Sequence, residues 1–371
     1  MHREPPPEGA DNNTRPFVIF FGYLATCLGL AVFIVSRLFK KSLQPPKSSV
    51  ALLPPKRHVY LFSALAASSL LTTWTHMFRY FSVSYQIWLM WRSHYELKPH
   101  QKHWGLWLKE TSLFREAWET VIIGNARYWW SHQIFFFALG LGLYLDQKGV
   151  RRGIKYTWVF MLLGQIVAIS FATNLFFLTL LFTPPIRSQP TSALQQRTWL
   201  GPWLINLVAI LATAYPAMLL ADEHYWHHPT AFMPVLLAPH VALLLLPLAR
   251  IVIPEKYLVE SVPFVNKVYT YLWALVLGNA SLMLAWTTVT AYSYGGFQSV
   301  IHALHEHPAV SSVGYDVIFC WISWLSWFMT EGVGTKRNPT VHEDDMTSVP
   351  KQHVSSTVVN TSGYDNIVRR R

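Results

Sequence analysis

The stretch FVIFFGYLATCLGLAVFIVSRLF, residues Phe17–Phe39, decides the fold class. A run of about 20 apolar residues crosses the roughly 30 Å hydrocarbon core of a bilayer as a helix. The basic residues Arg37, Lys40 and Lys41 close the run like a stop-transfer flank, and no small-residue cleavage site follows it. We therefore interpret the run as a signal anchor and not as a cleavable signal peptide.

The rest of the chain repeats this apolar pattern. Hydrophobic residues make up 52% of the 371 residues and charged residues only 13%, about half the charged fraction typical of soluble domains. No short alternating strands of a barrel appear, and open sheet edges cannot lie in lipid. The sequence predicts an all-α, polytopic membrane helix bundle with about eight transmembrane helices. The further spans are Tyr60–Tyr80, Trp130–Leu145, Tyr156–Thr183, Leu200–Ala221, Phe232–Ile253, Val268–Ala291 and Val313–Thr330.

Composition divides the chain into three parts. Residues 1–16 form a short polar tail, residues 17–331 the transmembrane domain, and residues 332–371 a polar tail that we expect to be disordered. Residues 81–128 are a long loop in which Trp and Tyr alternate with Lys and Arg. This mixture is typical of helices in the headgroup region, and a lid over a cavity is the alternative. The net charge of +11 then anchors the protein to the bilayer, and we expect no nucleic-acid partner.

The distribution of Lys and Arg predicts the orientation. Basic residues in the short loops 40–57 and 146–155 place both loops in the cytosol. Eight spans then put both termini in the lumen, and we expect a multi-pass protein of the endoplasmic reticulum. Glycosylation patterns that begin at Asn12 and Asn360 agree with this orientation. The sixth loop, which follows Arg250, conflicts with it because its basic residues fall on the lumenal side.

Carboxyl groups near the spans are candidates for catalysis, because an ionisable group at membrane depth is costly without a function. Residues Glu110–Leu145 are predicted to form one long helix. Glu116 and Glu119 share a face of that helix, and Arg127 falls on the same side. The alternative is an interfacial charge network that seats the helix.

Asp316 lies about one turn inside the last predicted span, near the cytosolic face and beside apolar residues. A carboxyl in such a desolvated site can stay protonated, as a general acid at neutral pH requires. Glu331 closes the same span on the opposite side, where Glu116 and Glu119 are expected. For each carboxyl a structural role is the alternative. The candidate acids are Glu119, Asp316, Glu116, Asp222 and Glu331.

Histidine clusters offer a competing hypothesis, a membrane di-iron hydroxylase or desaturase. Neutral imidazole is a good ligand for iron. The clusters begin at His100, His224 and His302, and without metal they are polar loop residues at the membrane edge. His240 lies alone inside a span, where we interpret it as an interhelical hydrogen-bonding group. The clusters are His100-x-x-His103, His224-x-x-His227-His228 and His302-x-x-His305-x-His307.

Two stretches, TSLFREAWET at Thr111–Thr120 and ARYWW at Ala126–Trp130, resemble fungal membrane-bound terpene cyclases of meroterpenoid pathways. The closest resemblance is to the eight-span group linked to ascochlorin and ascofuranone biosynthesis. The resemblance implies that the substrate is a prenylated phenol with a terminal epoxide. It also implies that the enzyme protonates the epoxide and cyclises the farnesyl chain through a carbocation, without a metal or other cofactor.

This chemistry suggests roles for residues near the candidate acids. A carbocation is stabilised by aromatic faces, each contributing about 0.5–2 kcal/mol. Arg127 would orient a carboxylate or bind the polar head of the substrate. A non-enzymatic lipid transporter or lipid-binding protein remains a further alternative. The predicted substrate-binding residues are Arg127, Trp129, Trp130, Trp324 and Trp327.

Overall fold

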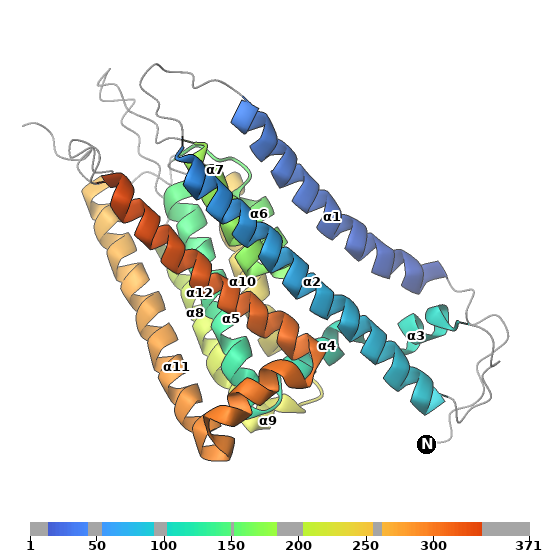
Figure 1. Ribbon diagram of the computed structural model, residues 1–371. Helices are drawn as coiled ribbons and strands as arrows, with labels where there is room; N and C mark the ends of the chain where they lie inside the picture. Colours follow the sequence, from blue (N-terminus) through green and yellow to red (C-terminus); the bar gives the residue numbers. More distant parts are fainter. Residues whose placement is uncertain are drawn as a thin grey trace, which may run out of the picture.

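The computed structural model describes residues 14–43, 54–92, 102–149, 152–183, 203–254 and 262–335. Every regular element in these ranges is helical, which confirms the predicted all-α class, and the helices pack into one bundle (Figure 1). The elements are α1 (Thr14–Leu43), α2 (Lys56–Arg92), α3 (Trp104–Glu110), α4 (Leu113–Ile122), α5 (Asn125–Tyr144), the π-helix η3 (Leu145–Gly149), α6 (Thr157–Ile166), α7 (Ile169–Leu181), α8 (Trp203–Leu220), α9 (Glu223–Trp226), α10 (Phe232–Val252), α11 (Val262–Glu306) and α12 (Pro308–Thr335).

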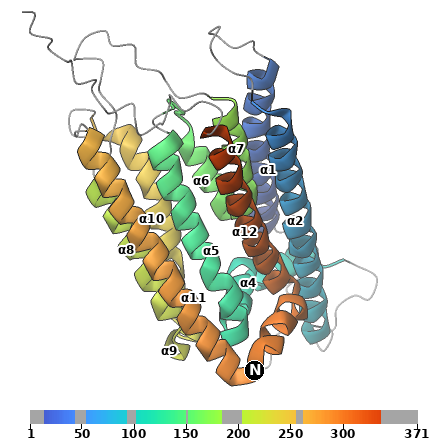
Figure 2. The same cartoon turned by 60° about the vertical axis from the view of Figure 1, so that its left-hand side comes forward.

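Five of the described helices are long and apolar enough to cross a membrane: α1, α8, α10, and parts of α11 and α12. Large apolar side chains on them face outward, such as Val18 on α1, Leu211 on α8 and Leu282 on α11. Helices α2 and α5 run beside them along the bundle (Figure 2). The chain is therefore an all-helical protein of the membrane type, and the count of eight spans stays a prediction.

The predicted span Tyr156–Thr183 is wrong, because this segment folds as a hairpin of two short helices. Helix α6 has 10 residues and α7 has 13, so each is too short to cross a bilayer. Between them Ala168 is extended, with φ −169° and ψ 135°. Arg152, shortly before α6, donates to the carbonyl of Leu180 at the end of α7 over 2.7 Å. The hairpin therefore enters and leaves the bundle at the same end.

The hairpin changes the expected position of the termini. Helix α1 begins and α12 ends at opposite ends of the bundle (Figures 1 and 2), whereas eight crossings would bring them to one end. Where α1 finishes, Lys41 Nζ donates to Thr183 Oγ1 over 2.6 Å, beside the ends of the hairpin. We call this end the basic end and the other, with α3, α4 and α9, the α4 end. The basic end carries Lys41, Lys56, Arg152, Arg250 and Lys267.

The predicted continuous helix Glu110–Leu145 is also wrong. Thr111 is extended after α3, and Gly124 adopts φ 109° between α4 and α5, a conformation that costs glycine little. The segment therefore begins at the last residue of α3 and contains two separate helices, α4 and α5, so Arg127 does not continue the face of α4. Residues 81–92, expected within a loop, are the last turns of α2.

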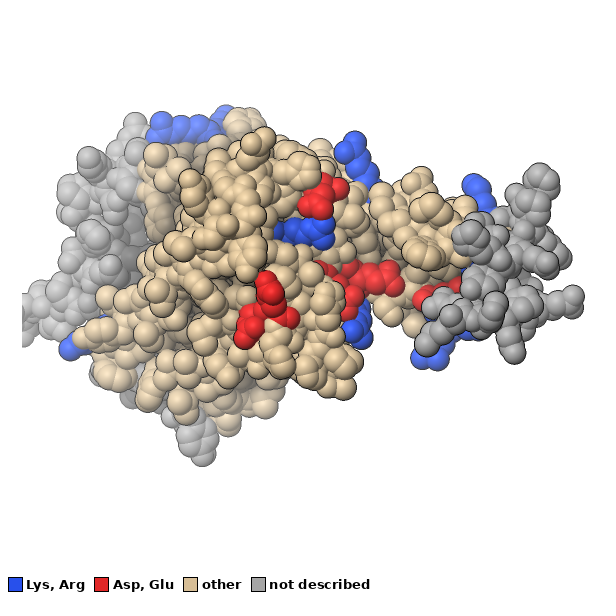
Figure 3. Space-filling view, turned by 90° about the horizontal axis from the view of Figure 1, so that it is seen from below, with Lys and Arg blue, Asp and Glu red and all other residues tan. Residues whose placement is uncertain are grey.

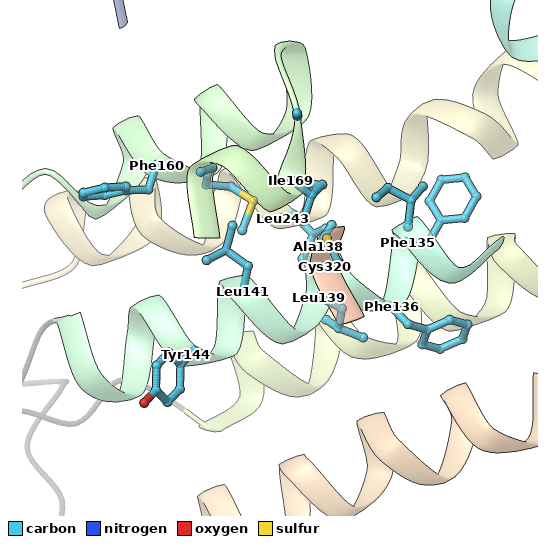
Figure 4. Packing of buried hydrophobic residues seen from close by; sticks show 14 of the residues in the cluster. Phe135, Phe136, Ala138, Leu139, Leu141, Tyr144, Phe160, Ile169, Leu243 and Cys320 are labelled. Atoms are coloured by element: carbon cyan, nitrogen blue, oxygen red, sulfur yellow. The ribbon is translucent and has the colours of Figure 1, made fainter. Parts of the chain in front are cut away.

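Helix α5 lies at the centre of the bundle and is buried on most sides. Its Ala138 and Leu141 point toward the hairpin, which contributes Phe160 and Ile169 to the core (Figure 4). Gly142 permits this contact, since a Cβ atom there would lie 3.0 Å from Met161 Cε. The hairpin is therefore held by close packing as well as by its own hydrogen bonds.

A buried ion pair joins four elements at the basic end. Asp146 in η3 forms a salt bridge with Arg250 on α10, and their side chains are 3% and 6% exposed. Asp146 Oδ2 also accepts from Asn206 Nδ2 on α8 over 3.0 Å and from Tyr269 Oη on α11 over 2.5 Å. The carboxylate is thus both paired and hydrogen-bonded, as burial of a charge requires.

Candidate active site

A cavity of about 830 Å³ lies where the apex of the α6–α7 hairpin meets α2, α4, α5, α10 and α12. Helix α1 covers one side, and Tyr23 Oη donates to the carbonyl of Ile166 at the apex over 2.8 Å. Three cations also line the cavity, of which Arg15 and Lys109 are exposed and Arg115 is partly buried. Most of the wall is apolar, and its aromatic members are Phe20, Tyr23, Tyr80, Phe81, Phe114, Trp118 and Phe135.

Asp316 is the only carboxyl among the described residues that line this cavity. It lies on α12 and is 6% exposed. Its Oδ2 accepts from the backbone N–H of Ile169 over 2.9 Å and its Oδ1 from that of Ser170 over 2.8 Å. The first N–H groups of a helix lack partners within it and carry partial positive charge, so Asp316 caps α7.

The other described carboxyl candidates have structural partners and do not line the cavity. Glu116 accepts from the backbone N–H of Ser112 over 2.8 Å and so caps its own helix. Glu119 forms an ion pair with Arg115 over 2.7 Å, one turn away on α4. Asp222 accepts from the backbone N–H of His224 over 2.9 Å and caps α9.

The expected position of Glu116 and Glu119 beside Glu331 is wrong. Helix α4 borders the same cavity as Asp316, and Tyr80 Oη donates to the carbonyl of Leu113 at the start of α4 there. Glu331 is 15 residues further along α12 than Asp316, which is about 22 Å of helical rise toward the basic end. The side chain of Glu331 lies outside the part of the chain whose side chains are described.

Arg127 faces a different partner from the one expected. It forms a salt bridge with Glu306 at the end of α11, and its Nε donates to Glu306 Oε2 over 3.3 Å. Both residues line a second hollow, of about 740 Å³, at the α4 end. Figure 3 shows acidic and basic side chains side by side on this face. Glu306 was missed from the sequence because it lies 179 residues from Arg127.

None of the four predicted tryptophans lines the cavity of Asp316. Trp129 Nε1 donates to Thr288 Oγ1 on α11 over 2.8 Å, and Trp130 Nε1 to the carbonyl of Val300 over 2.8 Å. Trp324 and Trp327 pack around Phe177, with the ring of Trp327 stacked on it at 4.4 Å. These tryptophans hold helices together, and other aromatic residues surround the cavity.

His240 on α10, predicted from the sequence to be an interhelical hydrogen-bonding group, lines the cavity. Its Nδ1 lies 3.0 Å from the carbonyl oxygen of Leu236. The rings of Trp118 and Phe135, which also line the cavity, stand at right angles to the imidazole at 5.3 and 6.2 Å. The sequence does show a polar residue within an apolar span, which could have marked His240 as a candidate. Its position in the cavity could not be predicted, because the neighbouring rings come from α4 and α5.

The histidine clusters do not converge in the described part of the chain. His224, His227 and His228 lie in and after α9, whereas His302, His305 and His307 lie at the end of α11. No three His, Cys, Asp or Glu side chains of the described residues come close enough to hold a metal ion. His103 precedes α3, and His100 lies outside the described residues. The di-iron alternative therefore gains nothing from this arrangement.

Comparisons with protein-family models, curated proteins and solved structures found no match to the chain. The cavity and its side chains are therefore the basis for assigning a function. Its volume lies within the roughly 300–1,000 Å³ of small-molecule sites. A mainly apolar wall with one carboxyl and one imidazole suits an apolar ligand that undergoes proton transfer.

Proposed function

We propose that the protein is a membrane-bound terpene cyclase that protonates the terminal epoxide of a prenylated, farnesyl-bearing phenol. The observation that carries the proposal is Asp316, the single carboxyl on the described wall of an apolar, aromatic-rich cavity. Asp316 is the proton donor. Glu119, Glu116 and Asp222 serve the structure of α4 and α9, where their hydrogen bonds are already formed.

The surroundings of Asp316 suit an acid that opens an epoxide. Each carboxyl oxygen has two lone pairs, so a proton on either oxygen is compatible with both backbone hydrogen bonds. When that proton moves to the epoxide oxygen, a carboxylate remains. The N–H groups of Ile169 and Ser170 already point at its oxygens and stabilise the new charge without rearrangement.

The carbocation that forms next is stabilised by the aromatic wall. Trp118 and Phe135 stack on each other at 5.9 Å and both line the cavity. Tyr80 and Phe81 come from α2. Each desolvated aromatic face contributes about 0.5–2 kcal/mol toward a nearby cation. A farnesyl chain partitions into lipid, so a cavity among apolar helices shortens its path.

The protein is proposed to be multi-pass in the endoplasmic reticulum, with the basic end in the cytosol. Short loops rich in Lys and Arg favour the cytosolic side. With the hairpin, the connection between α10 and α11 shares this end, and the conflict at the sixth loop disappears. Helix α1 then begins in the lumen and α12 ends in the cytosol. Asn12 and Asn360 lie outside the described residues, and this orientation exposes only the Asn12 pattern to glycosylation.

The test is turnover of a farnesylated phenol epoxide by membranes of a host that lacks the pathway. The expected product is a cyclised isomer with the mass of the substrate, formed by the wild type and absent with Asp316→Asn. Glu119→Gln is the matched control and retains activity. Unchanged substrate in the presence of folded wild-type protein contradicts the proposal. Unchanged substrate that co-purifies with the protein favours the lipid-binding alternative instead.

A further inference from the structure

We propose that His240 is the base that ends the cyclisation by removing a proton from the last carbocation. This inference rests on the proposed function, because it concerns the closing step of the same reaction. A cascade started by proton donation must finish by proton loss or by capture of a nucleophile. The cavity that holds Asp316 therefore needs an acceptor if the product is an alkene.

The hydrogen bond of His240 fixes its tautomer. Nδ1 lies 3.0 Å from the carbonyl oxygen of Leu236, one turn earlier on α10. A carbonyl oxygen can only accept, so Nδ1 carries the hydrogen and a neutral ring keeps a lone pair on Nε2. Nε2 has no hydrogen-bond partner among the described residues, and the ring borders the cavity. The imidazole is thus oriented as a proton acceptor.

The other ionisable groups of the described wall are unsuited to this task. Tyr23 and Tyr80 donate their hydroxyl hydrogens to the carbonyls of Ile166 and Leu113, each over 2.8 Å. Arg15, Lys109 and Arg115 are cations without a free lone pair. After Asp316 has given up its proton, its carboxylate is stabilised by the N–H groups of Ile169 and Ser170, which weakens it as a proton acceptor. Among the described residues that line the cavity, His240 is the only histidine.

The neighbours of His240 place the cation beside the base. Trp118 and Phe135 stand at right angles to its ring and stack on each other. Their faces attract the positive charge, and a neutral imidazole does not repel it. Since α10 carries His240 and α12 carries Asp316, donor and acceptor reach the cavity from different helices. The farnesyl chain of the substrate can therefore be protonated at Asp316 and deprotonated at His240.

The steps balance in protons and electrons. The Asp316 hydroxyl proton passes to the epoxide oxygen, the C–O bond breaks, and the oxygen becomes a hydroxyl group. Alkene π pairs form the new C–C bonds and move the positive charge along the chain. The C–H pair beside the last cation becomes a C=C bond, and its proton passes to Nε2 of His240. The product is an isomer of the substrate, and exchange with water then resets both side chains.

The experiment compares the products of wild type, His240→Gln and His240→Ala from the same farnesylated phenol epoxide. With His240→Gln, epoxide is still consumed, but the main alkene falls by at least about tenfold relative to other products. Those products are alkene isomers and alcohols heavier by one water. Added imidazole is expected to restore the main alkene with His240→Ala. Size-exclusion chromatography and thermal unfolding in detergent establish that each variant is folded.

The outcomes separate this inference from the proposed function. If the folded wild type leaves the epoxide unchanged, the function itself is wrong. If the wild type turns over and His240→Gln gives the same products in the same proportions, the function stands and the base is not His240. If folded His240→Gln no longer consumes epoxide, His240 acts in the first step, and the inference is again overturned.

Discussion

Asp316 Oδ1 accepts a hydrogen bond from the backbone N–H of Ser170 over 2.8 Å, across 146 residues of sequence. The bond joins the last helix to the apex of the hairpin, and Oδ2 makes the equivalent bond to the preceding residue. The side chain of Asp316 therefore caps the start of α7, directly after the break between the two helices of the hairpin. It is also the only carboxyl of the described cavity wall. The same carboxyl thus has a structural role and the proposed catalytic role.

Replacing Asp316 by Asn is expected to reduce both stability and activity. The amide oxygen can accept one of the two backbone N–H groups, but the NH₂ group faces the other. A buried donor left unpaired costs about 1–3 kcal/mol. Loss of the acidic proton should lower epoxide consumption by at least about 100-fold. Thermal unfolding in detergent and product analysis measure the two effects.

Asn174→Ala separates these effects. Asn174 Nδ2 donates to the carbonyl of Ser170 over 2.9 Å and to Ser323 Oγ over 2.8 Å, so it also joins the hairpin to α12. It does not line the cavity. The variant should be destabilised by a similar amount, about 1–3 kcal/mol, and still consume epoxide. If it loses activity as completely as Asp316→Asn, the effect is structural and the acid assignment fails.

The helical class was predictable, and the hairpin was not. Long apolar runs such as Phe17–Phe39 indicate helices by length and composition alone. The break at Val167–Ala168 lies in an apolar run without proline, and the carboxyl that caps it is Asp316, 147 residues from Ile169. The local sequence around the break therefore does not reveal that a distant carboxyl caps α7. Gly124, which interrupts the other predicted helix, was a visible signal.

The candidate site was predictable only in part. Asp316 could be identified because a carboxyl among apolar residues of a span is energetically costly and therefore indicates a partner or a function. Glu119 looked equivalent, since its ion pair with Arg115 depends on rotamers that the sequence does not specify. The role of His240 depends on side chains from α4 and α5, which only the folded chain brings together. The burial and the hydrogen-bond partners of each side chain distinguish Asp316 from Glu119, which residue type alone does not.

The orientation predicts that one glycosylation pattern is used and the other is not. In microsomes, a glycosidase should increase the mobility of the wild type, and Asn12→Gln should remove that shift. Asn360→Gln should leave it unchanged, because α12 ends at the basic end, proposed to be cytosolic. A shift that disappears only with Asn360→Gln would reverse the orientation. Loss of part of the shift with each variant would restore the arrangement with both termini in the lumen.

The ion pair at the basic end should affect stability more than catalysis. Asp146→Ala leaves the guanidinium of Arg250, 6% exposed, without its carboxylate. Removing one partner of a buried pair costs about 3–5 kcal/mol. The double variant Asp146→Ala with Arg250→Met should recover much of that loss, because it leaves no unpaired charge. Thermal unfolding of both variants in detergent tests this, and equal unfolding temperatures would contradict it.

His307, in the turn between α11 and α12, should make stability depend on pH. Burial first, and then the charge of Arg127, lower the pKa of His307, while Glu306 opposes them. Its Nδ1 accepts from the backbone N–H of Ala309 over 3.2 Å, which requires that Nδ1 be unprotonated. The unfolded chain, with a pKa near 6.5, therefore binds the proton more readily than the folded chain.

The contribution of neutral His307 to stability is thus complete above about pH 6.5 and is lost as the pH falls toward the lower pKa of the folded state. Between about pH 7.5 and pH 5.5, the unfolding temperature of the wild type should decrease more than that of His307→Gln. The Gln variant cannot take up this proton, and its amide oxygen can still accept from Ala309. Thermal unfolding in detergent across this range measures the difference. Parallel curves for the two proteins would show that the turn does not titrate in this range.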